Sequence, residues 1–265
     1  MKRLFFASLT CLLFVLSCQT VPITGRQQLN IVPSGTLMSM SFNEYSDFLK
    51  KHEVITGTPD AQMVARAGGR IQHAVERYFS EQNLSDQLAG YKWEFNLVKD
   101  DAINAWCMPG GKVVVYTGIL PIAAGEDGLA VVMGHEISHA IAKHGNERMS
   151  QGLVAQMGGM ALSVALAEKT KETQDLFMTA FGVGSQVGIL LPYSRIQESE
   201  ADRLGLVFMA MAGYDPREAV AFWKRMAAGK KGTAPPAFLS THPADSKRIA
   251  DIEKLVPEAM GYYKK

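Results

Sequence analysis

The chain has almost no net charge and no hydrophobic run long enough to cross a membrane comfortably. Its 265 residues include 27 lysine and arginine residues against 26 aspartate and glutamate residues, a net charge of +1. This balance gives no indication of a nucleic-acid partner or of an anionic membrane surface. The apolar run from Leu4 to Leu16 holds about 13 residues, fewer than the roughly 20 that a transmembrane helix needs.

Cysteine is scarce, with 3 residues in the chain, and the N-terminus accounts for two of them. Basic residues followed by an apolar run predict a secretory signal peptide over residues 1–17. The sequence Val-Leu-Ser-Cys resembles a bacterial lipobox, so we expect cleavage before Cys18 and lipidation of that residue; an uncleaved anchor is the alternative, disfavoured by its length. Cys11 would leave with the signal peptide. Only Cys107 then remains as a thiol, which excludes an internal disulfide.

Internal repeats and dividing linkers are also lacking, so residues 18–265 are expected to form one domain with a sizeable core. Apolar periodicity predicts helices at about 34–52 and 60–82. Two strands follow, one within 91–100 and one in the β-branched run 110–120, and the rest is helical. The fold class predicted is therefore α+β, mainly helical with a small sheet.

The most informative motif is His-Glu-Ile-Ser-His at positions 135–139. Two histidines four residues apart lie on one face of a helix, where both imidazoles can bind one zinc ion. Glu136 stands beside the first histidine and can take a proton from metal-bound water. A chance match on a surface helix is the alternative. The apolar surroundings disfavour it, because they predict one long, largely buried helix over residues 126–149.

A third protein ligand is needed, and a second helix over residues 193–213 supplies the candidate. The pattern HExxHxxGxxH is excluded, because Ala142 and Gly145 stand where it needs glycine and histidine. Glu198 and Asp202 are four residues apart and share a face of the second helix. Glu198 would complete a site of two histidines and one carboxylate with an open fourth position. Asp202 would accept a hydrogen bond from a ligand histidine and fix its orientation.

HEISH followed by Glu-x-x-Ala-Asp resembles a family of zinc metallopeptidases. That family includes the CAAX prenyl proteases, stress proteases of the mitochondrial and bacterial inner membranes, and bacterial envelope lipoprotein peptidases. TGRQQL at 24–29, NAWCMPGGKVVVYTGIL at 104–120 and STHPADSKRI at 240–249 carry the same resemblance. It implies a zincin-like metallopeptidase domain with one Zn²⁺ per chain, in which an edge strand of the sheet flanks the active-site helix and binds an extended substrate.

The resemblance also implies a role for each matching residue. These are metal binding by His135, His139 and Glu198, general base catalysis by Glu136, substrate backbone binding at Asn104 and Ala105, and positions close to the zinc for His242 and Arg248.

The role of His242 stays open at this stage. It could stabilise the oxyanion of the reaction, or occupy the open zinc position in a resting state. It could also be only the neighbour of a helix that begins at Pro243. Arg248 could stabilise the same charge or pair with a carboxylate.

Residues 152–191 contain two apolar stretches, each of about 16 residues, separated by a charged segment. Buried core helices are favoured over a transmembrane hairpin because both stretches are short and interrupted by Gln or Ser. A hairpin that covers the active site or touches lipid is the further alternative. Cys107, beside the proposed substrate edge, is expected to be a packed thiol, with a redox or metal-regulatory role as the alternative.

Together these observations predict a zinc endopeptidase that cleaves misfolded or unassembled proteins. The N-terminus predicts a lipid-anchored location on the periplasmic side of a bacterial envelope, at the outer rather than the inner membrane. The expected partners are unfolded envelope proteins and the membrane reached through the lipid, with no nucleic acid; a homo-oligomer is possible. The alternative function is a chaperone or assembly factor that uses the same groove with latent protease activity.

Overall fold

The computed structural model describes residues 18–185, 191–228 and 237–263. The predicted signal peptide, residues 1–17, lies outside these ranges. Further statements about elements and contacts refer to the described ranges.

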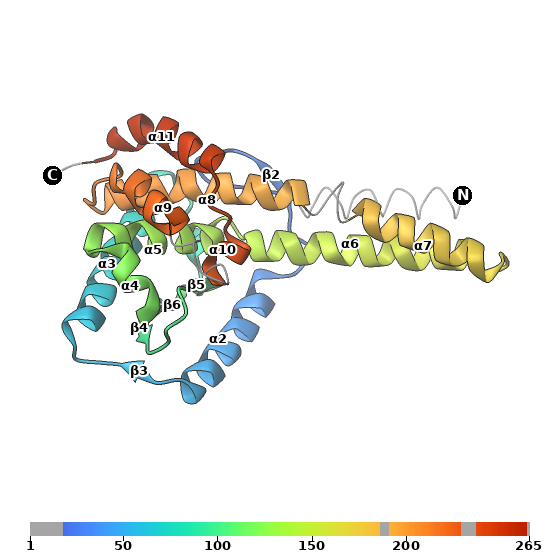
Figure 1. Cartoon of the computed structure of the whole chain (residues 1–265), viewed down its shortest axis with the longest axis horizontal. Helices are drawn as coiled ribbons and strands as arrows, with labels where there is room; N and C mark the ends of the chain where they lie inside the picture. The colour runs from blue at the N-terminus through green and yellow to red at the C-terminus, as the bar shows by residue number, and fades with distance from the viewer. Residues whose placement is uncertain (1–17, 186–190, 229–236, 264–265) are drawn as a thin grey trace. The chain divides into compact units, whose positions relative to one another are not determined.

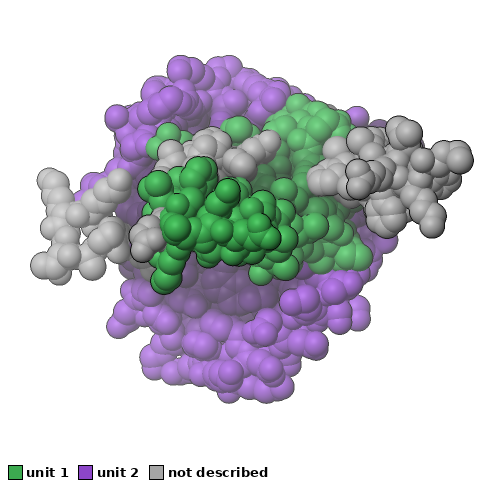
Figure 2. All heavy atoms as spheres, turned by 90° about the vertical axis from the view of Figure 1, so that its right-hand side faces the viewer, with its two compact units in different colours: residues 1–34, 143–197 green, residues 35–142, 198–265 purple. Residues whose placement is uncertain are grey.

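The chain divides into two compact units, drawn in different colours in Figure 2. Unit 1 contains Met1–Ser34 and Lys143–Gln197, and unit 2 contains Gly35–Ala142 and Glu198–Lys265. The expectation of a single domain from residue 18 stays a prediction.

Unit 2 is built on a four-stranded sheet in the order β3-β4-β6-β5. Its strands are β3 (Val54–Ile55), β4 (Glu94–Val98), β5 (Ala105–Met108) and β6 (Lys112–Tyr116). The two strands expected within 91–100 and 110–120 correspond to β4 and β6, which pair in parallel. The run predicted as one strand at 110–120 continues instead into a 3-10 turn, η2 (Thr117–Ile119), and helix α4 (Leu120–Ala123). β5 pairs only with β6 and forms one edge of the sheet.

Helices cover both faces of this sheet. Asn96 of β4 donates a hydrogen bond to the Tyr45 hydroxyl of α2 (Ser34–Lys51). The preceding residue, Phe95, packs against Gly68 of α3 (Pro59–Glu81) so closely that a Cβ on Gly68 would lie 2.2 Å from the Phe95 ring. Neighbouring residues of a strand point to opposite faces, so α2 and α3 lie on opposite sides of the sheet.

The central helix of unit 2 is α5 (Glu126–Ile141), which contacts α3 and the edge strand β5. The other helical elements are η1 (Ser85–Leu88), α8 (Leu191–Met211), α9 (Glu218–Ala228), α10 (Ala237–Thr241) and α11 (Ser246–Met260). Of α8, the residues from Glu198 onward belong to unit 2. In Figure 1, α5 and α8 run alongside each other. They touch through their backbones, because a Cβ on Gly205 of α8 would lie 2.9 Å from the Gly134 carbonyl carbon of α5. This close approach brings the functional side chains of the two helices together.

Unit 1 pairs β1 (Cys18–Thr20) with β2 (Gln27–Leu29) and packs this hairpin against the start of α6 (His144–Ala165). Arg26 and Glu147 anchor the contact with two hydrogen bonds of 2.6 and 2.8 Å. Helix α7 (Lys171–Ser185) folds back along α6, as Figure 1 shows. Gly158 of α6 makes room for the ring of Phe181 on α7.

Two sequence predictions about this region are wrong. The single helix expected over 126–149 is broken, because α5 ends at Ile141 and Lys143 adopts a left-handed conformation with φ of 55°. Two helices were correctly expected within 152–191, but they are not buried: Met157 is 68% exposed and Val164 77% exposed. None of the helices in the described ranges is long and apolar enough to cross a membrane.

Candidate metal centre

The metal-binding motif lies in the most buried helix of unit 2. Every residue of α5 from Gly128 to Ile141 is buried. Glu126 and Asp127 occupy its first turn, where negative charge suits the helix dipole. The spacing of four places His135 and His139 on one face, with ring centroids 4.7 Å apart.

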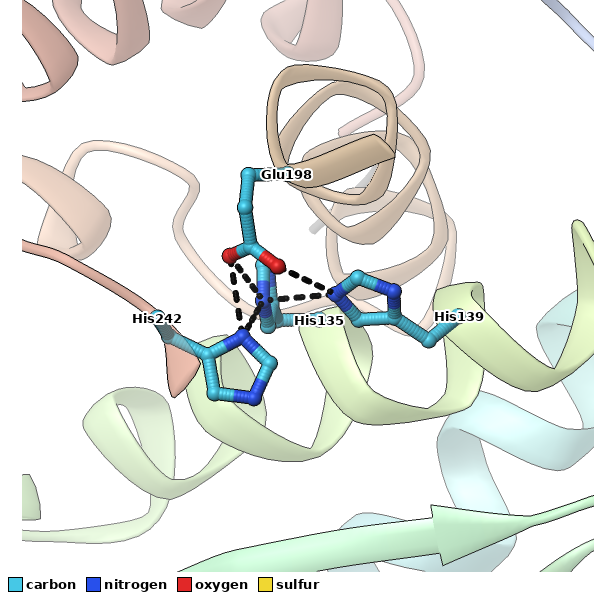
Figure 3. Close-up of side chains that lie close together, drawn as sticks. All are labelled: His135, His139, Glu198 and His242. Carbon is cyan, nitrogen blue, oxygen red and sulfur yellow. Dashed lines mark hydrogen bonds and ion pairs between the residues drawn. The ribbon is translucent and has the colours of Figure 1, made fainter. Parts of the chain in front are cut away.

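Four side chains converge at this face, as Figure 3 shows. The Nε2 atoms of His135 and His139 lie 3.1 Å apart. Each of the two Glu198 oxygens lies 3.3 Å from one of these nitrogens. His242 brings its Nδ1 to 3.1 Å from the Nε2 of His135 and 2.9 Å from Glu198 Oε2. The four possible ligand atoms all lie within 4.8 Å of one another.

This arrangement fits a zinc ion. A tetrahedral zinc with nitrogen ligands at about 2.0–2.1 Å holds neighbouring ligand atoms about 3.3 Å apart. The separations of 3.1 and 3.3 Å between His135, His139 and Glu198 match that geometry. Imidazole and carboxylate are also the donor types that zinc prefers. The three predicted ligands are therefore brought together as expected, with His242 as a fourth donor beside them.

Asp202 stands behind His135, one helical turn after Glu198. Its Oδ1 lies 2.9 Å from the Nδ1 of His135, so it holds the imidazole with Nε2 turned toward the centre. Arg248 clamps the same carboxylate with two hydrogen bonds of 2.8 Å, donated by Nε and Nη2. A third guanidinium nitrogen, Nη1, lies 3.1 Å from Glu198 Oε2. Arg248 thus pairs with Glu198 and Asp202 of α8 and lies at the centre.

The electrostatics of the centre favour ionised carboxylates despite their burial. Burial alone would raise the pKa of Glu198, but the hydrogen bonds from His135, His139 and His242 hold it well below its usual range. Burial opposes ionisation of Asp202 in the same way, and the charge of Arg248 together with the His135 hydrogen bond lowers its pKa. The centre therefore keeps two ionised carboxylates in a buried site, and Glu198 offers its charge to a bound cation.

Glu136 differs from these two carboxylates. It is 5% exposed, and its Oε1 accepts no hydrogen bond from any described residue. The nearest group is the Nε2 of His242, at 3.4 Å. Burial raises the pKa of Glu136 above its usual value, whereas His242 and His135 act in the opposite direction. A buried carboxylate oxygen that accepts no hydrogen bond from the described residues is available for water or substrate.

His242 reaches the centre from a short connection rather than from a helix. It follows α10, and α11 begins at Ser246 with Asp245 as its N-cap. The alternative in which His242 only precedes a helix starting at Pro243 is therefore wrong. The backbone N–H of Phe238 donates to Ile103 O at 3.1 Å, which joins α10 to the segment before β5.

Two aromatic residues support the centre, and sequence reasoning missed both. Trp223 lies under the guanidinium of Arg248, 3.7 Å from its Cζ to the ring centroid, and is fully buried. Phe238 stacks on His242 with ring centroids 4.6 Å apart. The available signal was the spacing of four between Phe238 and His242. Trp223 gave none, since an aromatic residue in an apolar helix usually indicates core packing.

The predicted substrate edge lies beside α5. Asn104 precedes β5 and accepts a hydrogen bond from the backbone N–H of Ala105, the first residue of the strand, at 3.0 Å. Ala105 is buried. Substrate binding by these two residues stays a prediction. Cys107 of β5 is free, and burial together with the charge of Glu136 raises its thiol pKa well above its usual value. This supports the packed-thiol interpretation.

Comparison with known proteins also indicates a metallopeptidase. The model of peptidase family M48 matches residues 65–256. The chain is 35% identical over 247 residues to the mitochondrial metalloendopeptidase OMA1 of Schizosaccharomyces pombe, covering 90% of this chain and 66% of that protein. The protein of the same name from Saccharomyces cerevisiae is 34% identical over 197 residues, covering 71% and 54%.

A bacterial relative is more distant. The β-barrel assembly-enhancing protease of Escherichia coli is 29% identical over 163 residues, which cover 60% of this chain and 33% of that protein. The chain thus spans between a third and two thirds of the length of these three relatives.

The comparisons correct the predicted location. A lipid-anchored position on the periplasmic side of a bacterial envelope is contradicted, because the relatives at 34% and 35% identity are mitochondrial. The bacterial lipoprotein branch of the family is not established. The signal peptide at 1–17 and the lipid on Cys18 have no support from these relatives.

Proposed function

The chain belongs to peptidase family M48, whose metallopeptidases use zinc, and we propose that its centre hydrolyses internal peptide bonds of unfolded or unassembled proteins. The observation that carries this proposal is the convergence of His135, His139 and Glu198, with a Glu136 oxygen beside them that accepts no hydrogen bond from a described residue. A purely structural cluster would have no need of a buried carboxylate oxygen without a hydrogen bond.

Zinc, when bound, acts as a Lewis acid that polarises a carbonyl and lowers the pKa of water. Glu136 accepts the proton of the attacking water at Oε1 and passes it to the nitrogen of the leaving amine. Its raised pKa suits this exchange, because a base that must also return a proton works best near the ambient pH.

Arg248 and His242 are proposed to stabilise the oxyanion that forms as the carbonyl is attacked. The guanidinium of Arg248 is fixed by Asp202 and Trp223, so its charge is oriented before substrate arrives. His242 has Nε2 directed to Glu136 and Nδ1 to Glu198. A position for Nδ1 among the ligand atoms also supports a resting state in which His242 occupies the open ligand position.

The substrate is proposed to bind in an extended form along the free edge of β5. Main-chain hydrogen bonds from a strand read little of the side-chain sequence. Such binding selects segments that are unfolded or locally extended, which supports misfolded or unassembled proteins as the substrate class. Asn104 and Ala105 would hold the peptide backbone where it enters the strand. The contact of β5 with α5 directs a peptide bound there toward the centre.

Glu136→Gln tests the proposal directly. Zinc content would be measured in the purified full-length chain, and casein digestion would be followed for wild type, Glu136→Gln and the control Glu81→Gln, which alters an exposed acid on α3. We expect about one zinc per chain in all three proteins, with cleavage lost only in Glu136→Gln. Cleavage that survives in that variant, or a folded chain that takes up no zinc, would overturn the assignment.

His242→Ala distinguishes its two proposed roles. If His242 stabilises the oxyanion, kcat falls by about 100-fold, the usual cost of one such donor. If it occupies the open position at rest, casein cleavage by His242→Ala exceeds that of wild type. Zinc retained without cleavage in both wild type and His242→Ala would favour the chaperone alternative, in which the groove binds unfolded chains but does not cut them.

A further inference from the structure

The exposed face of α6 carries an unbroken apolar stripe. Met149, Leu153, Met157, Met160 and Val164 are all exposed, from 38% for Leu153 to 77% for Val164. At 100° per residue they fall within about 40° of one direction and extend over about 22 Å of helix. We call these five residues the outer stripe. Exposed apolar surface on this scale marks an interaction site.

The outer stripe is distinct from the face that α6 uses inside unit 1. Gly158 lies on the opposite side of the helix, where a Cβ would meet Phe181 of α7 at 3.1 Å. The partner helix α7 therefore leaves the outer stripe uncovered.

We propose that the outer stripe is a self-association surface that pairs with the α6 of a second copy of this chain in antiparallel orientation. The spacing of the stripe supports this pairing. Four of its members are symmetric about the point between Gln156 and Met157, so a two-fold axis there sets Met149 against Val164 and Leu153 against Met160. The same surface then serves both copies, as a two-fold interface requires.

The charge distribution supports a second copy over other occupants. From Met149 to Ala167 the sequence has no charged residue, so nothing along the helix repels an identical helix. A helix lying on a membrane surface carries Lys and Arg on its polar face, and this segment has none. The antiparallel orientation also keeps the two β1-β2 hairpins, each packed at the start of its α6, at opposite ends of the pair.

Sedimentation velocity of the full-length chain over a range of concentrations tests the proposal. Met157→Glu places a charge near the two-fold axis, and we expect it to weaken association by at least about tenfold, as a central interface residue does. The control Thr179→Glu adds the same charge at an exposed position of α7, outside the stripe, and should associate like wild type. Far-ultraviolet circular dichroism would show that both variants keep their helices.

The orientation has its own test. Leu153→Glu and Leu153→Glu/Met160→Glu are expected to be monomers, whereas Leu153→Glu/Met160→Lys should associate again. In the last variant, antiparallel pairing sets the introduced carboxylate of each copy against the introduced ammonium group of the other, while parallel pairing sets like charges together. Failure of this charge-reversed double variant to recover association, with its helix content intact, would overturn the antiparallel pairing.

A wild-type chain that stays monomeric at about 100 μM, a concentration far above the dissociation constants of specific complexes, would overturn the proposal. Stripe variants that associate as wild type does would also overturn it. So would a monomeric chain that floats with phosphatidylcholine vesicles through the stripe. The readout is mass, so it does not depend on zinc or on peptidase activity.

Discussion

The metal centre of unit 2 and the outer stripe of unit 1 depart from ordinary protein architecture in opposite directions. The centre buries charge: the side chains of Asp202 and Arg248 are 5% and 9% exposed. The stripe exposes apolar surface, with Met160 64% exposed. Charged residues are rarely buried unless paired, and large apolar patches are rarely left in water. The first departure is explained by a ligand held inside the fold, and the second by a partner outside it.

Removing a ligand from the centre is expected to have the largest effect on the protein. His139→Ala should reduce zinc affinity by more than about 100-fold, the upper range for loss of an outer partner of a ligand, and casein cleavage should disappear with the zinc. Metal analysis after dialysis and a cleavage assay would measure both. His73→Ala, which alters a histidine with a side chain 78% exposed, is the control. Full zinc content in His139→Ala would contradict the site.

Truncating a methionine in each unit compares a buried side chain of α5 with an exposed side chain of the outer stripe. Met133 of α5 is completely buried, so Met133→Ala should lower the free energy of unfolding by about 2–5 kcal/mol. Met160→Ala in the outer stripe should change it by less than about 0.5 kcal/mol, because the side chain is already in water. Urea unfolding at low protein concentration measures the difference. Equal losses would mean that the stripe is buried within the folded chain.

Asp202→Asn tests whether Asp202 holds His135 in the orientation that binds zinc. The variant keeps the shape of the side chain but loses its charge, so His135 is oriented less firmly and Arg248 loses its strongest partner. Zinc affinity should fall by about 10- to 100-fold, measured by competition with a chelator. The control Asp251→Asn, an exposed acid of α11, should bind zinc as wild type does. An unchanged zinc affinity in Asp202→Asn would show that Asp202 has no role in metal binding.

The smallest effect concerns a partly exposed acid on the same helix as the histidines. Burial would raise the pKa of Glu126, but hydrogen bonds from Tyr214 and Arg66 lower it below 4.5 overall. Its folded pKa is depressed, so its stabilisation is complete above about pH 4.5 and is lost as the pH falls through the folded value. Glu126→Gln should therefore cost up to about 1 kcal/mol at pH 7 and less at pH 3, measured by urea unfolding. A cost independent of pH would contradict this.

Spacing along helices was enough to predict the centre of the site. His135 and His139 share a face because they are four apart, and the same holds for Glu198 and Asp202. The structure brings both pairs together, as the sequence led us to expect. The meeting of the two helices depends on Gly134 and Gly205, whose backbones touch. Neither glycine indicates by itself which helix it will contact, so this close approach of α5 and α8 could not be predicted from the sequence.

The remaining features depend on contacts that a sequence does not encode locally. The break between α5 and α6 falls at Lys143, a residue without the conformational signature of glycine or proline. Apolar composition in 152–191 predicted helices correctly, but it cannot distinguish burial within a chain from burial between chains. Trp223 packs under Arg248, 25 positions along the sequence, and no periodic pattern links them.

The distance in sequence between His135 and His242 has a consequence for synthesis. The two side chains meet across 107 residues. At about 5–20 residues per second, a ribosome needs roughly 5 to 20 seconds to make that stretch. At the start of this interval His135 has been made, but Glu198, Asp202 and His242, which surround it in the folded protein, have not. The growing chain therefore carries an incomplete metal centre until α11, which holds Arg248, has been translated.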